Sequence, residues 1–131
     1  MILRSVGIAG AIVVGLTVVS IGTILGVAGV REAVAARRER VVAVSPIIGT
    51  SPIEGPAHRF LAGVGETECS ARVMARLYRD VAGTFLIHDT EPAIVHTEIA
   101  ELGLTPVATN IIMADRVGRA RLAHTALEAL A

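Results

Sequence analysis

The sequence predicts an α/β fold of Rossmann-like type, in which a mostly parallel sheet carries helices on both faces. Short apolar runs alternate along the chain with stretches of helical periodicity, and the connections between them are short. The apolar runs are continuous, as in parallel strands that are covered on both sides. With 131 residues, 53% of them hydrophobic, the chain can form one domain with a core of ordinary size.

The first apolar runs, Ile12 to Val14 and Val18–Val19, are rich in β-branched residues and predict buried strand. Ser20-Ile21-Gly22 is then expected to form the loop at the end of that strand. Val27 to Arg38 predicts a helix, because valines recur along one side of it and arginines lie elsewhere.

The next apolar run, Val41 to Val44, predicts a strand that ends before Pro46, since proline cannot donate to a strand ladder. Gly49 to Pro56 is rich in glycine and proline and predicts a loop. Pro56 suits the first turn of a helix that runs to about Ala62.

The second half of the chain repeats the alternation. We expect a helix at Ser70 to Val81, a strand at Thr84 to His88, a turn at Asp89 to Pro92 into a helix that ends near Leu102, a strand at Thr105 to Ile112, and a last helix from Asp115. Ser70 and Asp115 can cap their helices, and Gly103 can end the helix before it. The last helix is expected to bury a stripe formed by Ala120, Ala123, Leu127 and Leu130.

Composition argues against several classes of function. The 12 acidic and 12 basic residues cancel, and aromatic residues are scarce, so neither a nucleic-acid site nor an anionic membrane surface is favoured. No lysine is present, which excludes a lysine Schiff base or a P-loop lysine. Cys69 is the single cysteine, so no internal disulfide can form, and a reducing cytoplasm is expected. Neighbouring carboxylates are expected to raise its pKa, which makes it a weak nucleophile.

The uncharged amino terminus leaves a membrane interpretation open. Residues 5 to 30 contain no charged side chain, and arginines lie on both sides of this interval, as they do around a transmembrane helix. Six glycines interrupt the interval, and they favour short buried elements over one continuous helix.

Three loops are candidates for a ligand site, because ligands of parallel α/β sheets bind outside the carboxyl ends of the strands. These loops are Ser20 to Gly22, Ser45 to Gly55, and Asp89-Thr90. The middle loop offers hydroxyl groups and backbone N–H groups of the kind that hold phosphate. It carries no glycine fingerprint or nucleophile elbow, so an ordinary loop is the alternative.

For the other polar residues, a structural role is favoured over a functional one. The four histidines show no spacing typical of metal ligands, and no metal site is predicted from them. His88-Asp89 could act with Glu91 in acid–base chemistry, but a turn is favoured. Arg72, Arg76 and Arg79 could hold an anionic ligand from one helix, but a solvated helix face is favoured.

Two segments carry a resemblance to a known family. V-V-S-I-G-T-I-L from Val18 and V-A-V-S-P-I-I-G from Val42, in this order and separation, resemble the 2-phospho-L-lactate transferases, which include the bacterial phosphoenolpyruvate transferases of coenzyme F-420 synthesis. Weaker collinear matches continue through Gly83 to Ile87 and Asn110 to Asp115. The resemblance spans residues 10–131, which look like the carboxyl-terminal part of the transferase domain, and leaves residues 1–9 poorly matched.

The resemblance implies a Rossmann-like transferase. Family members move a phospholactyl or phosphoenolpyruvyl group from a guanosine diphosphate-activated donor to the deazaflavin Fo, releasing GMP with the assistance of Mg²⁺. Catalytic residues and metal ligands are not assigned within this chain. The residues expected to bind substrate are Ser20, Gly22, Ser45, Pro46, Gly49 and Gly55.

The sequence also departs from the family. Full members are more than twice as long and begin with a glycine-rich phosphate loop, which has no counterpart here. Gly15-Leu16-Thr17 stands in place of a Pro-Ser-Asn-Pro turn, and Thr50 and Glu54 replace a glycine and a basic residue. A carboxylate near a diphosphate would repel it.

Three hypotheses therefore stand. The chain is a truncated or fragmentary transferase that works with a missing amino-terminal half or as a homo-oligomer; or it is a non-catalytic interaction module that pairs through an exposed sheet edge; or it is a single-span membrane protein.

Overall fold

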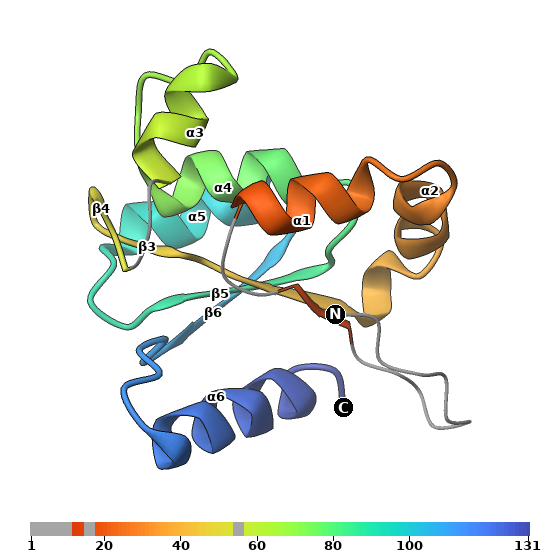
Figure 1. The fold of residues 1–131 in the computed structure, drawn as a ribbon. Coiled ribbons are helices and arrows are strands. Elements are labelled where there is room, and N and C mark those ends of the chain that lie inside the picture. The colour runs from red at the N-terminus through yellow and green to blue at the C-terminus, as the bar shows by residue number, and fades with distance from the viewer. Residues whose placement is uncertain (1–11, 15–17, 54–56) are drawn as a thin grey trace.

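The computed structural model describes residues 12–14, 18–53 and 57–131 (Figure 1). Strands and helices alternate along them, as predicted. The elements are β1 (Ile12–Val14), α1 (Val18–Leu25), α2 (Val30–Ala35), the 3₁₀ turn η1 (Arg38–Arg40), β2 (Val41–Val44), β3 (Ile47–Ile48), β4 (Ser51–Pro52), α3 (Ala57–Gly63), α4 (Ala71–Tyr78), β5 (Thr84–His88), α5 (Ala93–Glu101), β6 (Thr105–Thr109) and α6 (Arg116–Glu128).

The main sheet has the strand order β1-β2-β5-β6, and every neighbouring pair in it is parallel. Helices connect each strand to the next, as parallel pairing requires. The predicted α/β, Rossmann-like fold is therefore confirmed. It is small, and β3 and β4 form a separate antiparallel hairpin.

The two faces of the sheet build two cores. Val41 and Ala43 of β2 pack into a cluster with α1, α4 and α5, whereas Val42 and Val44 pack into a second cluster with α6. This alternation follows from the two-residue period of a strand. Figure 1 shows α6 on the opposite side of the sheet from α1, α4 and α5, which confirms helices on both faces.

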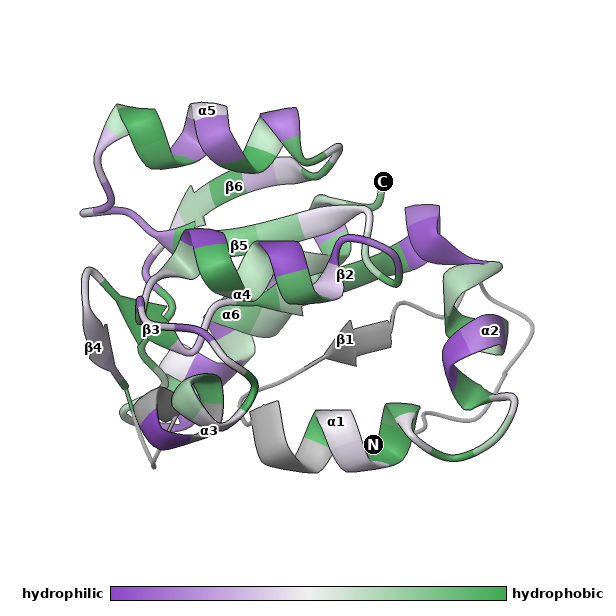
Figure 2. Ribbon diagram, turned by 90° about the horizontal axis from the view of Figure 1, so that it is seen from above, coloured by the Kyte–Doolittle hydropathy of each residue, from purple (hydrophilic) through white to green (hydrophobic). Residues whose placement is uncertain are grey.

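The central strands are buried along their whole length. All four residues of β2 and all five of β5 are buried, which explains the unbroken apolar run of β2 and the apolar centre of β5 between Thr84 and His88. Figure 2 shows both hydrophobic and hydrophilic positions along α4 and α5, as expected for helices with one face in the core.

Local chemistry places several helix boundaries as predicted. The Ser70 hydroxyl accepts a hydrogen bond from the Val73 N–H at the start of α4, and Asp115 Oδ1 accepts one from the Gly118 N–H at the start of α6. Gly103 follows α5 with a φ of 85°, the left-handed conformation that ends helices.

The predicted strand at Val18–Val19 is wrong, because these residues begin helix α1. Their β-branched side chains favour a strand locally, but Ile21 and Leu25, four residues apart, are both buried in the core. Gly22 of the same helix is exposed. Tertiary packing of one apolar face therefore overrides the local preference.

The predicted helix at Val27 to Arg38 is shorter than expected. It begins only after Gly29, whose φ of 82° lies in the left-handed region, and it ends at Ala35. Arg38 then donates hydrogen bonds of 2.6 Å to the carbonyl oxygens of Arg79 and Gly103. These bonds hold the η1 turn against the segment that follows α4 and the segment that follows α5. The chain enters β2 directly after this turn.

Part of the predicted loop from Gly49 is a hairpin. Strands β3 and β4 pair Ile48 with Ser51, which leaves Gly49 and Thr50 as a two-residue connection. Gly49 has a φ of 60°, as the tight turns of such hairpins require.

The last strand also ends earlier than predicted, at Thr109. Asn110 Oδ1 accepts a hydrogen bond from the Ile112 N–H, and this local turn competes with the strand.

The predicted apolar stripe of α6 is wrong at Ala120, Ala123 and Leu127 and is confirmed only at Leu130. Leu122 and Ala126 are buried against the sheet with Leu130 packed beside them, whereas Ala120 and Ala123 are exposed and Leu127 is 57% exposed. Both stripes have helical spacing, so periodicity alone could not choose between them; contact with Leu86 and Ile111 does. Within the described residues, no helix is long and apolar enough to cross a membrane.

We predict that Leu86→Ala destabilises the fold by about 2–5 kcal/mol, because the Leu86 side chain is fully buried between β2 and α6. Urea unfolding followed by circular dichroism measures this change. The control Leu127→Ala removes an exposed leucine from α6 and should shift the free energy of unfolding by no more than about 0.5 kcal/mol. Equal effects of the two substitutions would contradict the assignment of the buried helix face.

Candidate functional site

The candidate site lies at the carboxyl ends of β2, β5 and β6, where ligands of parallel α/β sheets bind. Hydrogen bonds join the three loops that leave these strands. The Gly49 N–H donates to Glu91 Oε1 at 2.7 Å, and the Asp89 N–H donates to the Thr109 carbonyl at 3.0 Å. The β3–β4 hairpin, the turn after β5 and the end of β6 therefore form one continuous rim.

Ser45 and Pro46 form the base of the hairpin. Ser45 is fully buried; its hydroxyl donates to the Ile47 carbonyl at 2.9 Å and accepts from the Ile47 N–H at 3.1 Å. The Pro46 carbonyl accepts from the Ile53 N–H at 2.8 Å. Both residues thus shape the turn that presents Gly49, and their contact with a ligand stays a prediction.

Gly49 is the exposed tip of this arrangement. A Cβ added at Gly49 would meet no atom within 4 Å, so glycine is favoured at this position by the positive φ and not by crowding. Its N–H faces the Glu91 carboxylate, which shows that the tip can hold an oxygen acceptor. Sequence reasoning did not predict this contact, because the two residues are 42 positions apart.

Two further predicted substrate residues, Ser20 and Gly22, do not join this rim in the structure. Ser20 and Gly22 lie within α1 and not in a strand-end loop, so the loop predicted there is wrong. Their role in binding stays a prediction. Gly55 and Glu54 fall outside the described residues, as does Gly15-Leu16-Thr17, and Thr50 is exposed on the hairpin.

His88 ends β5 with a side chain that is only 10% exposed. Its Nδ1 atom lies 2.6 Å from Asp89 Oδ1, but the contact lacks the alignment of a hydrogen bond. The Glu91 N–H donates to the His88 carbonyl, which closes the turn that the sequence favoured. Because Glu91 Oε1 accepts from Gly49, the three residues do not form an acid–base relay here.

The arginines of α4 are engaged in ion pairs. Arg72 pairs with Glu68 and Glu98, and Arg76 pairs with Glu66. Hydrogen bonds from the Ser70 hydroxyl and the Arg72 guanidinium lower the pKa of Glu68. These are half-exposed pairs of the kind found on solvated helix faces, and they leave neither cation free for an anionic ligand.

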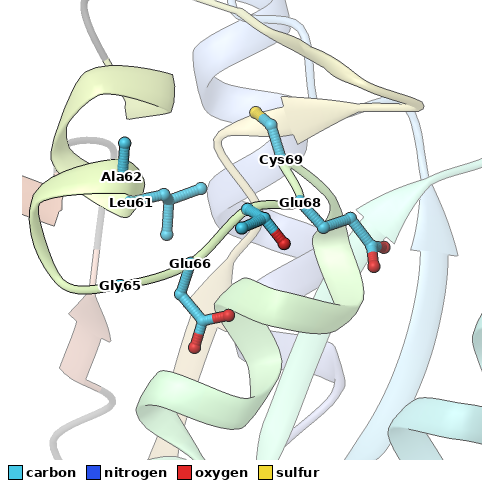
Figure 3. Close-up of a pocket in the computed structure, with 7 residues that line it drawn as sticks. Leu61, Ala62, Gly65, Glu66, Glu68 and Cys69 are labelled. Carbon is cyan, nitrogen blue, oxygen red and sulfur yellow. The ribbon is translucent and has the colours of Figure 1, made fainter.

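A concavity of about 360 Å³ lies between α3 and the start of α4 (Figure 3). Among the residues that the structure describes, no predicted substrate residue lines it. Its walls are Leu61, Ala62, Gly65, Glu66, Thr67, Glu68 and Cys69. Burial raises the pKa of the Cys69 thiol, which confirms the predicted direction but replaces the predicted cause, the neighbouring carboxylates.

The described residues contain no group of three or more His, Cys, Asp or Glu side chains that could hold a metal ion. The expectation of Mg²⁺ therefore rests on the family resemblance alone.

Comparison with known proteins gives one clear relationship. No protein-family model matches the chain. Over 112 residues it is 44% identical to the phosphoenolpyruvate transferase of Kitasatospora aureofaciens, a match that covers 84% of this chain and 34% of that protein. It is 40% identical over 111 residues to the phosphoenolpyruvate transferase of Streptomyces griseus, covering 85% of this chain and 35% of that protein. The 2-phospho-L-lactate transferase of Methanopyrus kandleri is 38% identical over 112 residues, again 84% and 34%.

The chain is a partial homologue of the phosphoenolpyruvate and 2-phospho-L-lactate transferase family. The resemblance that the sequence motifs predicted is thereby confirmed. The chain spans about a third of the length of the curated relatives it matches, and the match extends over most of the chain itself.

We predict that Glu91→Ala increases amide hydrogen exchange at Gly49 roughly fivefold, because an exposed hydrogen bond contributes about 1 kcal/mol. Glu91→Gln is the matched control, since its amide oxygen can still accept from the Gly49 N–H. Exchange measured by NMR on both variants tests whether Glu91 holds the hairpin. Unchanged exchange in Glu91→Ala would rule the contact out.

We predict that Cys69 reacts with iodoacetamide more slowly than an unfolded cysteine at pH 8, because its raised pKa leaves less thiolate at a given pH. The rate should keep rising with pH beyond the point where the urea-unfolded chain levels off. Intact-protein mass spectrometry across a pH series measures both profiles. Identical profiles for folded and unfolded chain would contradict the shift.

Proposed function

We propose that the chain is part of a transferase that moves a phospholactyl or phosphoenolpyruvyl group from a guanosine diphosphate-activated donor to the deazaflavin Fo in coenzyme F-420 synthesis. The observation that carries this proposal is the 38–44% identity, over about 84% of the chain, to proteins named as phosphoenolpyruvate or 2-phospho-L-lactate transferases. The matched segment folds as a parallel α/β sheet, an architecture suited to nucleotide ligands.

The proposed reaction is a substitution at phosphorus. The Fo hydroxyl oxygen forms a new O–P bond to the phosphate that carries the three-carbon group, and the phosphoanhydride bond to GMP breaks. GMP leaves with the bonding electrons, and the hydroxyl proton passes to solvent or a base. Negative charge builds on the phosphoryl oxygens, so donors already oriented toward them would lower the barrier.

The hairpin supports this proposal in one specific way. Gly49 presents a backbone N–H at the rim, and in this structure a carboxylate oxygen of Glu91 accepts from it. A phosphate oxygen of the donor could replace that carboxylate oxygen. Because Mg²⁺ is expected from the family resemblance alone, we assign the metal no step.

We predict that Gly49→Val lowers turnover at least tenfold, because a β-branched residue is strained at a φ of 60° and would displace the N–H. Gly49→Asn is the matched control, since asparagine tolerates this conformation, and it should retain most of the activity. The assay uses the Kitasatospora aureofaciens relative with its matched segment replaced by this chain, supplied with Fo, activated guanosine donor and Mg²⁺.

Mass spectrometry of the product identifies the group transferred, and quantification of GMP gives the rate. A stably folded hybrid that converts none of the activated donors would refute the proposed function. Equal turnover of the valine and asparagine variants would refute the part assigned to Gly49.

A further inference from the structure

The two edges of the sheet differ in their ability to accept another strand. Strand β1 forms one edge and β6 the other, and in the described part of the chain no strand lies beyond either. An open edge presents backbone N–H and C=O groups that can pair with a further strand. The register and hydrogen bonds show which residues present these groups.

In a parallel ladder, the N–H and C=O groups of one residue point to the same side of the strand, and those of the next residue point to the opposite side. The Thr105 N–H donates to the Gly83 carbonyl and the Thr109 carbonyl accepts from Asp89, so the odd residues of β6 face β5. Pro106 and Ala108 therefore face the open edge. Proline has no N–H, so this edge lacks a donor at Pro106 and is poorly suited to a new strand.

The β1 edge has no such block. The Val41 carbonyl accepts from the Gly83 N–H, so Val41 faces β5 and Val42 faces β1. Since Val13 is paired in register with Val42, the backbone of Ile12 and Val14 faces β2, and the N–H and C=O of Val13 face the open edge. The sequence of β1 is Ile-Val-Val, without charge or proline.

We infer that β1 is an interior strand of the complete family fold, and that its open edge accepts a parallel strand from the part of that fold which this chain does not span. The relatives are about three times as long as their matched segment, so they contain ample chain to supply the strand. A parallel strand is favoured because every pair in the sheet is parallel. The inference holds whether that part belongs to the same polypeptide or to another.

Two matched substitutions test the inference. Val13→Pro removes the outward N–H of β1, and Ala108→Pro removes the outward N–H of β6; proline is tolerated at both positions in this chain if both are edges. Each variant should therefore unfold in urea close to the unsubstituted chain. Destabilisation of Val13→Pro alone would show that its N–H pairs inward and would overturn the assignment.

The substitutions are then placed in the hybrid of the Kitasatospora aureofaciens relative that carries this chain. There Val13→Pro should lower the melting temperature by about 5 °C or more, because it would interrupt an interior ladder. Ala108→Pro should change it by much less. Equal shifts, or a larger shift for Ala108→Pro, would overturn the inference.

A binding measurement provides an independent test. The tagged chain is co-expressed with the remaining two-thirds of the same relative, and the two should co-purify as a one-to-one complex that Val13→Pro weakens at least tenfold and Ala108→Pro does not. A homodimer lost in Val13→Pro, or no association at all, would overturn the inference. Because the readouts are melting and binding, an absence of transferase turnover would affect the proposed function and not this result.

Discussion

The parallel pairing of β2 with β5 is the constraint on which the rest of the structure depends. Both strands are buried along their length, so helices must cover both faces, and each face selects alternate residues of the same two strands. The pairing is parallel, so β2 and β5 end at the same edge of the sheet. The hairpin after β2 and the turn after β5 are thereby brought together, and Gly49 can reach Glu91.

Arginine side chains hold this frame at several points by bonding to the backbone. Arg38 reaches the carbonyls that follow α4 and α5, and Arg121 reaches the carbonyls of Asn110 and Ile112 after β6. Each guanidinium carries several donors in a fixed plane, so one side chain can satisfy two carbonyl oxygens at once. The connections are therefore tied to the helices and strands they join.

Local sequence was sufficient where local chemistry decides the structure. Strands β2 and β5 are continuous apolar runs bounded by turn residues, and Ser70, Gly103 and Asp115 act at helix ends as their side chains or backbone freedom dictate. Local sequence failed where distant contacts decide. Val18–Val19 form a helix because Ile21 and Leu25 reach the core, and the contact of Gly49 with Glu91 joins residues far apart in sequence.

The hairpin is an intermediate case. Gly49-Thr50 follows the β-prone pair Ile47-Ile48, and a two-residue connection that begins with glycine is typical of hairpins, so part of its signal was present in the sequence. The surrounding prolines and glycines obscured it, since they are equally typical of an irregular loop. Of the candidate site, the sequence could therefore identify the loop but not its shape or its partner.

The proposed diphosphate donor is negatively charged, so its binding depends on which positive groups of the chain are free. Arg31, Arg38, Arg72, Arg76 and Arg121 are each engaged with a carboxylate or a backbone carbonyl, and withdrawing any of them would leave that partner unsatisfied. Neutralisation of the proposed diphosphate donor would then come from backbone N–H groups such as that of Gly49, from the other arginines, or from the part of the family fold that this chain does not span. A strand added at β1 would extend the same carboxyl edge of the sheet and bring its own connecting loop to the rim. If both proposals hold, the strand that completes the sheet would also contribute to the site.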